Sequence, residues 1–298
     1  MARPAHEPRT VPLYTLIIPP VLILIIVVIS GQLPDGKLHV WFLDVGQGDA
    51  IMIKTPGGRT ALVDGGPGPT DVLNGIGAYV SFYQRDLDLM MLTHPHDDHM
   101  AGLPDVLSRY RVGQVAQTVF TGTNGVRGEW LSRLAQQGTP VYYPGRGDRI
   151  TFAGEPDISL QVLNPPTPAA ISDRQGNDVN NAGLVVRLDY GRHRILLTGD
   201  AQVESEQSIS QALPGDLPST VLKVGHHGSD TSSTPAFLSK VRPTVAIISV
   251  GTDNRYNHPS DETLRNLQAV GAKIYRTDRN GTIEIITDKE QMWVRSER

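Results

Sequence analysis

The stretch Thr93-His94-Pro95-His96-Asp97-Asp98-His99 decides the fold of this chain. It follows directly after the apolar run Leu87 to Leu92, which predicts a buried strand that ends where the histidines begin. Three imidazoles and two carboxylates crowd into six residues, a density that a merely solvated loop has no physical reason to carry. We therefore interpret the stretch as a metal-binding loop at the end of a strand.

The spacing within this stretch predicts two metal ions rather than one. His94 and His96 stand two positions apart and can converge on one ion, while Asp98 and His99 turn toward a second ion about 3.5 to 4 Å away. We expect Asp97, which lies between ligands, to point elsewhere. The alternative is a surface loop that is rich in His and Asp by chance.

Composition narrows the class of protein and the ligand chemistry. The 298 residues suit one large domain or two small ones, and 30 Gly with 22 Pro indicate many turns and a β-rich body. The chain has 0 Cys, so any metal must be held by His, Asp, Glu or Asn, and a Cys nucleophile is excluded. A formal net charge of -4 is not the footprint of a nucleic-acid-binding surface.

The segment Val11 to Ile29 is almost wholly apolar and long enough to span a bilayer at about 1.5 Å per helical residue. Arg3 and Arg9 precede it, which predicts an N-terminus in the cytoplasm and an extracytoplasmic remainder. We expect an uncleaved single-pass anchor in the cell membrane. The alternative is a cleaved signal peptide and a secreted protein, because Val28-Ile29-Ser30 has the small-residue pattern of a cleavage site.

The domain organisation follows from these features. We predict a cytoplasmic stub and anchor over residues 1–30, a linker over 31–37 with the turn residues Pro34-Asp35-Gly36, and one domain over 38–298. In this domain, strands followed by helices occur twice. Strands are expected at 39–43, 50–54, 60–63, 87–92, 115–120, 140–143, 148–152, 158–163, 184–188, 194–198, 220–224, 245–249, 273–275 and 282–286, and helices at 71–83, 100–110, 129–137, 203–213, 235–241 and 261–270.

Four short motifs occur in an order and spacing that resemble the metallo-β-lactamase superfamily. They are Leu62-Val63-Asp64-Gly65-Gly66, His94 to His99, Thr198-Gly199-Asp200 and Gly225-His226-His227-Gly228-Ser229. The resemblance implies an α/β (α+β) fold, a four-layer αββα sandwich with metals at one edge. The order of strands then helices, repeated twice, agrees with this fold.

A second set of motifs is similar to the C-terminal extracytoplasmic domain of ComEC/Rec2 competence proteins. The set consists of Phe42 to Ala50, Asn180-Asn181, the Tyr190-Gly191 hairpin, Leu197 to Asp200, Lys223 to Ser229, His258-Pro259 and Arg276 to Thr282. The large multi-helix channel of those proteins has no counterpart here, where a single hydrophobic segment stands in its place.

The superfamily resemblance assigns roles to individual positions. Asp64 resembles the buried aspartate that holds the ligand loop by hydrogen bonds, although a turn aspartate before Gly65-Gly66 is an alternative. Asp200 resembles the carboxylate that bridges both ions, a role compatible with capping the next helix. Asp98 is expected to act in catalysis as well as in metal binding.

Of the adjacent pair His226 and His227, only one is expected to bind metal, because neighbours at a strand end point to opposite faces. We assign the metal to His226 and expect His227 to orient substrate or protonate a leaving group, with a structural imidazole as the alternative. Ser229 could bind a phosphoryl oxygen. Lys223 could neutralise a phosphate or extend from its strand, and His258 is expected near the mouth of the site.

One metal ligand that the resemblance to the superfamily leads us to expect has no counterpart in this sequence. A further His usually stands between the histidine cluster and the bridging aspartate, and the candidate His193 lies in a hairpin turn roughly 20 Å from Asp200 at about 3.3 Å per residue. Asn181 is expected at the position of the missing ligand, so the first ion would be loosely held and Mn could compete with Zn. The alternative is that Asn180 and Asn181 satisfy loop backbone groups.

These expectations define a function. Two divalent ions, Zn or Mn, would lower the pKa of bound water from 15.7 toward about 7 and favour hydrolysis. The resemblance implies a membrane-anchored phosphodiesterase or nuclease that acts on single-stranded DNA during competence-type uptake, alongside a separate channel protein. Alternatives are a hydrolase of another ester, such as a phosphorylcholine or teichoic-acid esterase, a lactone or lactam hydrolase, or a non-catalytic tethered module with a weakened metal site.

Overall fold

The computed structural model describes residues 18–21, 33–81, 83–120, 125–168, 170–171 and 178–298. The chain divides into one unit at residues 1–34 and a second at residues 35–298. No helix in the described part of the chain is long and apolar enough to cross a membrane. Apart from residues 18–21, the predicted anchor lies outside the described residues.

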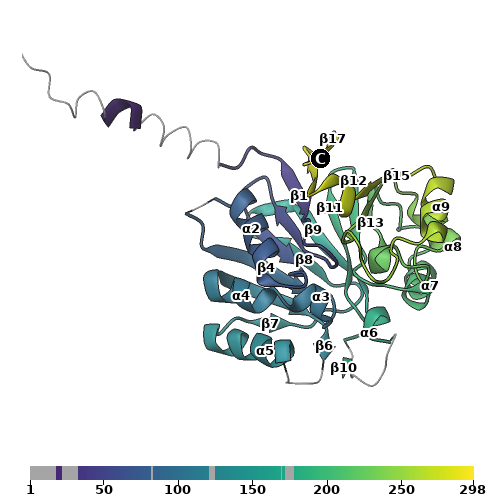
Figure 1. Ribbon diagram of the computed structural model, residues 1–298, viewed down its shortest axis with the longest axis horizontal. Helices are drawn as coiled ribbons and strands as arrows, with labels where there is room; N and C mark the ends of the chain where they lie inside the picture. The colour runs from purple at the N-terminus through teal and green to yellow at the C-terminus, as the bar shows by residue number, and fades with distance from the viewer. Residues whose placement is uncertain (1–17, 22–32, 82, 121–124, 169, 172–177) are drawn as a thin grey trace, which may run out of the picture. The chain divides into compact units, whose positions relative to one another are not determined.

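Residues 35–298 form two mixed β-sheets with helices on both outer surfaces, so the predicted sandwich is confirmed (Figure 1). The first sheet has the strand order β17-β16-β1-β2-β3-β4-β5-β7. Its strands are β1 (Leu38–Phe42), β2 (Ile51–Lys54), β3 (Thr60–Val63), β4 (Asp86–Leu92), β5 (Arg111–Gln117), β7 (Val141–Tyr142), β16 (Ile283–Thr287) and β17 (Met292–Ser296).

The second sheet has the strand order β15-β14-β13-β12-β11-β9-β8. Its strands are β8 (Arg149–Phe152), β9 (Glu155–Asn164), β11 (Val185–Tyr190), β12 (His193–Leu197), β13 (Val221–Lys223), β14 (Val245–Ile248) and β15 (Lys273–Arg276). Two short strands, β6 (Val119–Phe120) and β10 (Ala170–Ile171), pair separately in parallel.

Helices cover the outer face of each sheet. Those of the first half are α2 (Pro69–Tyr79), α3 (Asp97–Met100), α4 (Leu103–Arg109) and α5 (Gly125–Gln137). Those of the second half are α6 (Asp178–Asn181), α7 (Val203–Ala212), α8 (Pro235–Val241), α9 (Asp261–Ala269) and α10 (Thr277–Asn280), with the 3-10 turn η1 (Gly225–Gly228).

Side-chain alternation along the strands builds the core in three layers. On β1, Val40 and Phe42 face the space between the sheets, where they pack with Leu160 and Val162 of β9. The intervening Trp41 faces outward and packs in the layer between the first sheet and its helices. A third buried layer lies between the second sheet and α7, α8 and α9. Both faces of each sheet are thereby removed from water.

The parallel strands bring their carboxyl ends to one edge of the sandwich. Strands β3, β4 and β5 run parallel in the first sheet, as do β12, β13, β14 and β15 in the second. Loops that leave the carboxyl ends of such strands commonly form the binding site of an open α/β sheet. The motifs singled out in the sequence follow β3, β4, β12 and β13 at this edge.

The helix predicted over 100–110 is instead two helices, α3 and α4, separated at Gly102. A Cβ atom at Gly102 would lie 2.2 Å from the carbonyl oxygen of Gly65. The backbone therefore has to pass close to the loop after β3, which glycine permits. Before this break, Asp98 and His99 lie on the short helix α3 rather than in a loop.

Candidate metal centre

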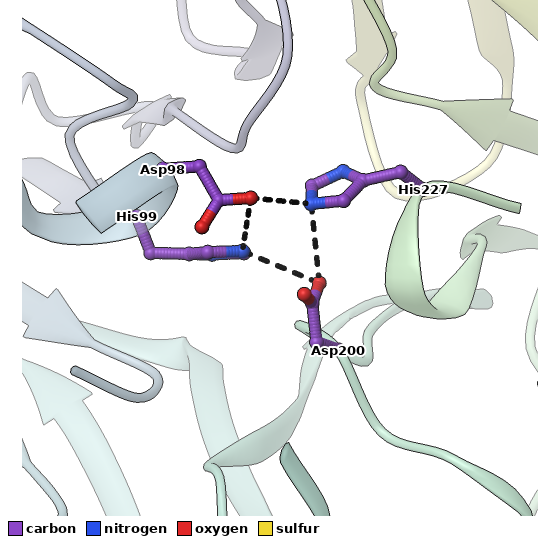
Figure 2. A group of neighbouring side chains, drawn as sticks. All are labelled: Asp98, His99, Asp200 and His227. Carbon is purple, nitrogen blue, oxygen red and sulfur yellow. Dashed lines mark ion pairs between the residues drawn. The ribbon is translucent and has the colours of Figure 1, made fainter. Parts of the chain in front are cut away.

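Four side chains from three loops converge at the sandwich edge (Figure 2). Asp98 and His99 come from α3, Asp200 follows β12, and His227 lies in η1 after β13. Asp200 Oδ1 lies 3.3 Å from His99 Nε2 and 3.4 Å from His227 Nε2. Asp98 Oδ2 lies 3.4 Å from His227 Nε2 and 4.0 Å from His99 Nε2.

These separations fit a shared cation. In a tetrahedral site with bonds of about 2.0 to 2.1 Å, the ligand atoms lie about 3.3 Å from one another. The atoms His99 Nε2, His227 Nε2 and Asp200 Oδ1 are buried and have no hydrogen-bond partner among the described residues. Buried polar atoms without partners are rare and costly, so a group that binds all three would remove the cost.

A second candidate group lies on the other side of Asp200. It consists of His94, His96 and Asp200, with His94 Nε2 3.7 Å from Asp200 Oδ2 and 3.0 Å from His96 Nδ1. Asp200 therefore presents Oδ1 to one group and Oδ2 to the other. This is the arrangement required of a carboxylate that bridges two ions.

Asp64 lies beneath the histidine loop and holds it in place. Its carboxylate accepts hydrogen bonds from the backbone N–H and the hydroxyl of Thr93 (2.8 and 2.7 Å) and from His99 Nδ1 (2.8 Å). Since the Thr93 hydroxyl gives its proton to Asp64, it accepts one from His94 Nδ1 (3.1 Å). Both His94 and His99 thus carry their proton on Nδ1 and direct a lone pair from Nε2 toward the candidate ions.

The two adjacent histidines differ in which nitrogen carries the proton. His227 Nδ1 donates to the carbonyl of Ser249 (2.9 Å), which leaves a lone pair on Nε2. The amide nitrogen of Gln202 donates to His226 Nδ1 (3.1 Å), so the proton of His226 is on Nε2. His227 thus presents a ligand atom, whereas His226 presents an N–H donor 3.9 Å from Asp200 Oδ2.

This geometry favours His227 over the predicted His226 as the metal ligand. Both residues have a left-handed backbone, with φ of 45° and 54°, so the alternation of an extended strand does not apply to them. His227 is buried with the four-residue group, and His226 stands at its edge, half-buried.

Lys223 is fully buried and does not face substrate, which corrects its predicted role as a phosphate-binding group. Its Nζ lies 2.5 Å from Asp49 Oδ2, donates to the carbonyl of Gly199 (3.1 Å), and lies 3.9 Å from Asp200 Oδ1. Asp49 is likewise buried, and the sequence assigned it no role. Its neighbour Gly48 packs so closely that a Cβ would lie 2.1 Å from the carbonyl oxygen of Asp98.

The side chains of Asn181 and Ser229 are engaged elsewhere. Asn181 Oδ1 accepts from the backbone N–H groups of Gln202 and Ser205 (3.1 and 3.2 Å), and its Nδ2 donates to Glu204. It therefore caps the start of α7 and does not replace the missing histidine. Ser229 is 3% exposed and contacts Thr231 at 3.0 Å, so it is not available to a phosphoryl oxygen.

Asn180 has a different environment from its neighbour. It is buried, and its Oδ1 has no hydrogen-bond partner among the described residues. The backbone turn that it begins packs against the histidine loop, since Gly183 N donates to Asn180 O and Leu184 N donates to Thr93 O. Asn180, rather than Asn181, thus carries a side-chain oxygen without a hydrogen-bond partner in the part of the chain that the structure describes.

A cavity of about 440 Å³ opens over both ligand groups. It is lined by Gln47, Pro95, His96, Asp97, Asp98, Arg127, Asp200, His226, His227, Tyr256 and His258. His258 thus lies at the site, as the sequence indicated. Gln47, Arg127 and Tyr256 were not predicted as site residues. Gln47 lies within the motif Phe42 to Ala50 but was given no role, and Arg127 and Tyr256 lie outside the motifs singled out in the sequence. Arg127 donates from Nε and Nη2 to the carbonyl of Pro95 and so supports the histidine loop.

The charges of the centre favour a bound cation. Burial raises the pKa of Asp200, but the imidazoles of His227 and His99 outweigh it and hold the pKa well below its usual value. Burial lowers the pKa of His99, but Asp200 and Asp64 raise it well above the usual value. At His94, burial and the neighbouring His99 outweigh the effect of Asp200 and lower the pKa well below 6.5. The carboxylates thus stabilise positive charge at this edge.

Sequence comparison agrees with this architecture. A model of the metallo-beta-lactamase superfamily matches residues 43–252. The chain belongs to the metallo-β-lactamase superfamily. Membership of this superfamily and the two candidate ligand groups together indicate a metal-dependent hydrolase.

Two curated members of the superfamily related to this chain are competence-associated proteins. ComE operon protein 3 of Bacillus subtilis is 30% identical over 268 residues, which cover 84% of this chain and 33% of that protein. Competence protein ComA of Neisseria gonorrhoeae is 30% identical over 258 residues, 84% of this chain and 32% of that one. The predicted similarity to competence proteins is confirmed. The chain spans about a third of the length of these relatives.

A solved structure of the superfamily supports the fold alone. The metallo-β-lactamase fold protein YhfI from Bacillus subtilis matches with a TM-score of 0.51 and 14% identity, covering 82% of this chain and 98% of that one.

Proposed function

We propose that this chain is a metal-dependent phosphodiesterase that cleaves single-stranded DNA. The observation that carries the proposal is Asp200, whose two carboxylate oxygens face two separate ligand groups under one open cavity. Such two-ion sites suit the displacement of an oxygen at phosphorus, because both the attacking and the leaving oxygen need stabilisation. Divalent ions, Zn or Mn, would supply Lewis-acid chemistry and a lowered pKa of water here.

Residues of this chain would bind the ions, orient the histidine rings and contact the leaving oxygen. His94, His96, Asp98, His99, Asp200 and His227 would hold the ions, and Asp64 fixes the rings of the histidine loop. His226 offers an N–H on the cavity side of Asp200 and would donate a hydrogen bond to the leaving oxygen. Burial lowers the pKa of His226, so its neutral form dominates at neutral pH and its Nε2–H would stabilise charge on the leaving oxygen as a hydrogen-bond donor.

The choice of substrate rests on the kinship with competence proteins and on the shape of the site. The cavity is open and polar, and the chain carries a formal net charge of -4, so a long duplex gains little from the surface around the site. A single strand, which can bend into the cavity and present one phosphate at a time, fits these conditions better.

The proposed cellular setting is a membrane anchor at residues 11–29 with the domain outside the cytoplasm. The support is the apolar sequence of that segment and the Arg residues before it. A separate channel protein would then take up the strand that remains. Protease treatment of intact cells tests the orientation, since an extracytoplasmic domain is degraded without lysis and a cytoplasmic one is protected.

The activity is tested with the full chain, purified in mild detergent, treated with chelator and reloaded with Mn or Zn. Single-stranded DNA, bis-nitrophenyl phosphate and a chromogenic lactam are offered in parallel. We expect cleavage of both phosphodiesters and loss of cleavage in Asp200→Asn. Cleavage of the lactam alone would make the protein a hydrolase of another class, and no turnover with any substrate would leave a tethered non-catalytic module.

A further inference from the structure

We propose that Tyr256 and His258 form a stacking subsite for a nucleobase next to the phosphate that is cleaved. The inference rests on the proposed phosphodiesterase function and adds the part of the substrate that the cavity selects. Both side chains lie on the loop between β14 and α9 and line the same cavity as the candidate metal centre.

The rings form a continuous path that leads away from the centre. His226 lies beside Asp200, with His226 Nε2 3.9 Å from the carboxylate. Its ring centroid lies 5.7 Å from that of His258, and the two planes are tilted by 64°. The centroid of Tyr256 lies another 5.7 Å from that of His258, with the planes nearly parallel at 19°. A strand with its phosphate at Asp200 would therefore place its neighbouring base over these rings.

The outermost ring is accessible to such a base. Tyr256 is 49% exposed, so much of its side chain can contact a base. Stacking on an aromatic ring does not depend on base identity, because every base has a π face. A subsite of this kind suits an enzyme that degrades DNA of any sequence.

The loop is held in place before substrate arrives. The side chain of Asn254 closes it: Oδ1 accepts from the N–H groups of Tyr256 and His258, and Nδ2 donates to the carbonyls of His258 and Gly251. A fixed platform loses little conformational entropy when a base stacks on it.

A positively charged side chain, Arg255, contacts the ring of Tyr256. The guanidinium of Arg255 lies 4.9 Å from the centroid of the Tyr256 ring and donates to its hydroxyl at 2.7 Å. The arginine is exposed and adds positive charge where the next phosphate of the strand would pass. Aromatic rings interleaved with basic side chains are the common means of holding single-stranded nucleic acid.

Exposed tyrosines also occur away from the cavity, and they provide a matched control. Tyr143 is 41% exposed and is not among the residues that line the cavity. If any exposed tyrosine could contribute to substrate selection, truncating Tyr143 would have the same effect on it as truncating Tyr256.

The test compares two p-nitrophenyl phosphodiesters with the same leaving group, thymidine 5′-(p-nitrophenyl phosphate) and methyl p-nitrophenyl phosphate. For the metal-loaded full chain we expect a higher kcat/KM on the thymidine ester. Tyr256→Ala should lower the ratio of the two values by about 5- to 100-fold, since stacking on one ring contributes about 1–3 kcal/mol per base. Tyr256→Phe should keep the ratio, and Tyr143→Ala should not change it.

An unchanged ratio in both Tyr256→Ala and His258→Ala overturns the subsite. If neither ester is hydrolysed, the phosphodiesterase proposal fails, and the subsite is then decided by fluorescence anisotropy. The probes are a labelled oligothymidylate and its abasic tetrahydrofuran counterpart, which stay intact in that case. Tighter binding of the oligothymidylate that is lost in Tyr256→Ala supports the subsite, and equal binding of the two probes overturns it.

Discussion

Lys223 and Asp49 form a buried ion pair that joins the two sheets directly beneath the candidate metal centre, with Nζ 2.5 Å from Oδ2. Lys223 ends β13 of the second sheet, and Asp49 precedes β2 of the first. Both side chains are at most 1% exposed. The pair therefore fixes the distance between the two halves of the site.

Replacing Lys223 by methionine should strongly destabilise the protein. The Lys223→Met variant leaves the Asp49 carboxylate buried without its partner, and breaking a buried pair in this way costs about 3–5 kcal/mol. Urea unfolding of the chelator-treated full chain measures the loss. The double variant Lys223→Met/Asp49→Leu should recover much of it, because no buried charge remains. Lys289→Met, which removes an exposed pair with Asp157, should have a far smaller effect. A single variant as stable as the wild type would contradict this account.

Asp64→Asn should weaken metal binding while the fold is kept. The amide cannot accept from both Thr93 and His99 as the carboxylate does, so the proton on His99 Nδ1 is no longer fixed. Loss of such a supporting hydrogen bond typically lowers metal affinity by about 10- to 100-fold. Competition with a chelating dye measures the affinity, and circular dichroism checks the fold. Unchanged affinity would show that Asp64 is merely a turn residue.

Replacing His227 should reduce metal content, whereas replacing His226 should reduce the rate of cleavage. His227→Ala removes a lone pair that faces Asp200 and Asp98, so one bound ion per chain should be lost. His226→Ala should keep the metal content and lower kcat by about 100-fold or more on DNA, because a hydrogen-bond donor to the leaving oxygen is removed. The effect should shrink on nitrophenyl esters, whose leaving group needs less stabilisation. Loss of metal in His226→Ala instead would restore the assignment made from the sequence.

The stability of the protein should depend on the protonation of His39. Burial lowers its pKa, but hydrogen bonds to Glu284 and Asp35 raise the pKa above 6.5. A raised pKa in the folded state adds stability that is present below pH 6.5 and is lost as the pH rises through the folded value. The His39→Gln variant should therefore be less stable than wild type at low pH, by under about 1 kcal/mol, and equal to it at high pH. Urea unfolding across this range checks the trend, and a constant difference would contradict it.

The sandwich was predicted from the resemblance of four short motifs to the metallo-β-lactamase superfamily, and the order of strands and helices agreed with it. The apolar run before His94 and the motif before Asp64 end at the same edge, and the structure shows both ends there. The short helix α3 was not predicted, since four residues give no helical period. It ends at Met100, before the close backbone packing at Gly102, which no local pattern reveals.

The parts of the site that could not be predicted depend on contacts between distant segments. Spacing alone could not show whether His226 or His227 binds metal. The hydrogen-bond partner of each Nδ1 atom determines which ring directs a lone pair from Nε2. Lys223 and Asp49 lie within two separate motifs of the sequence, and their pairing could not be predicted because it exists only once the sheets meet. Asn181 was predicted to replace the missing metal ligand. Its side chain instead accepts a hydrogen bond from the backbone N–H of Gln202 at the start of α7.

The most direct test of the account is the number of divalent ions that the full chain binds. After chelator treatment, the protein is titrated with Zn or Mn, and bound metal is measured by mass spectrometry after removal of free ions. The account predicts two ions per chain, and fewer in Asp200→Ala, because Asp200 faces both ligand groups. Less than one tightly bound ion per chain with either metal would contradict it.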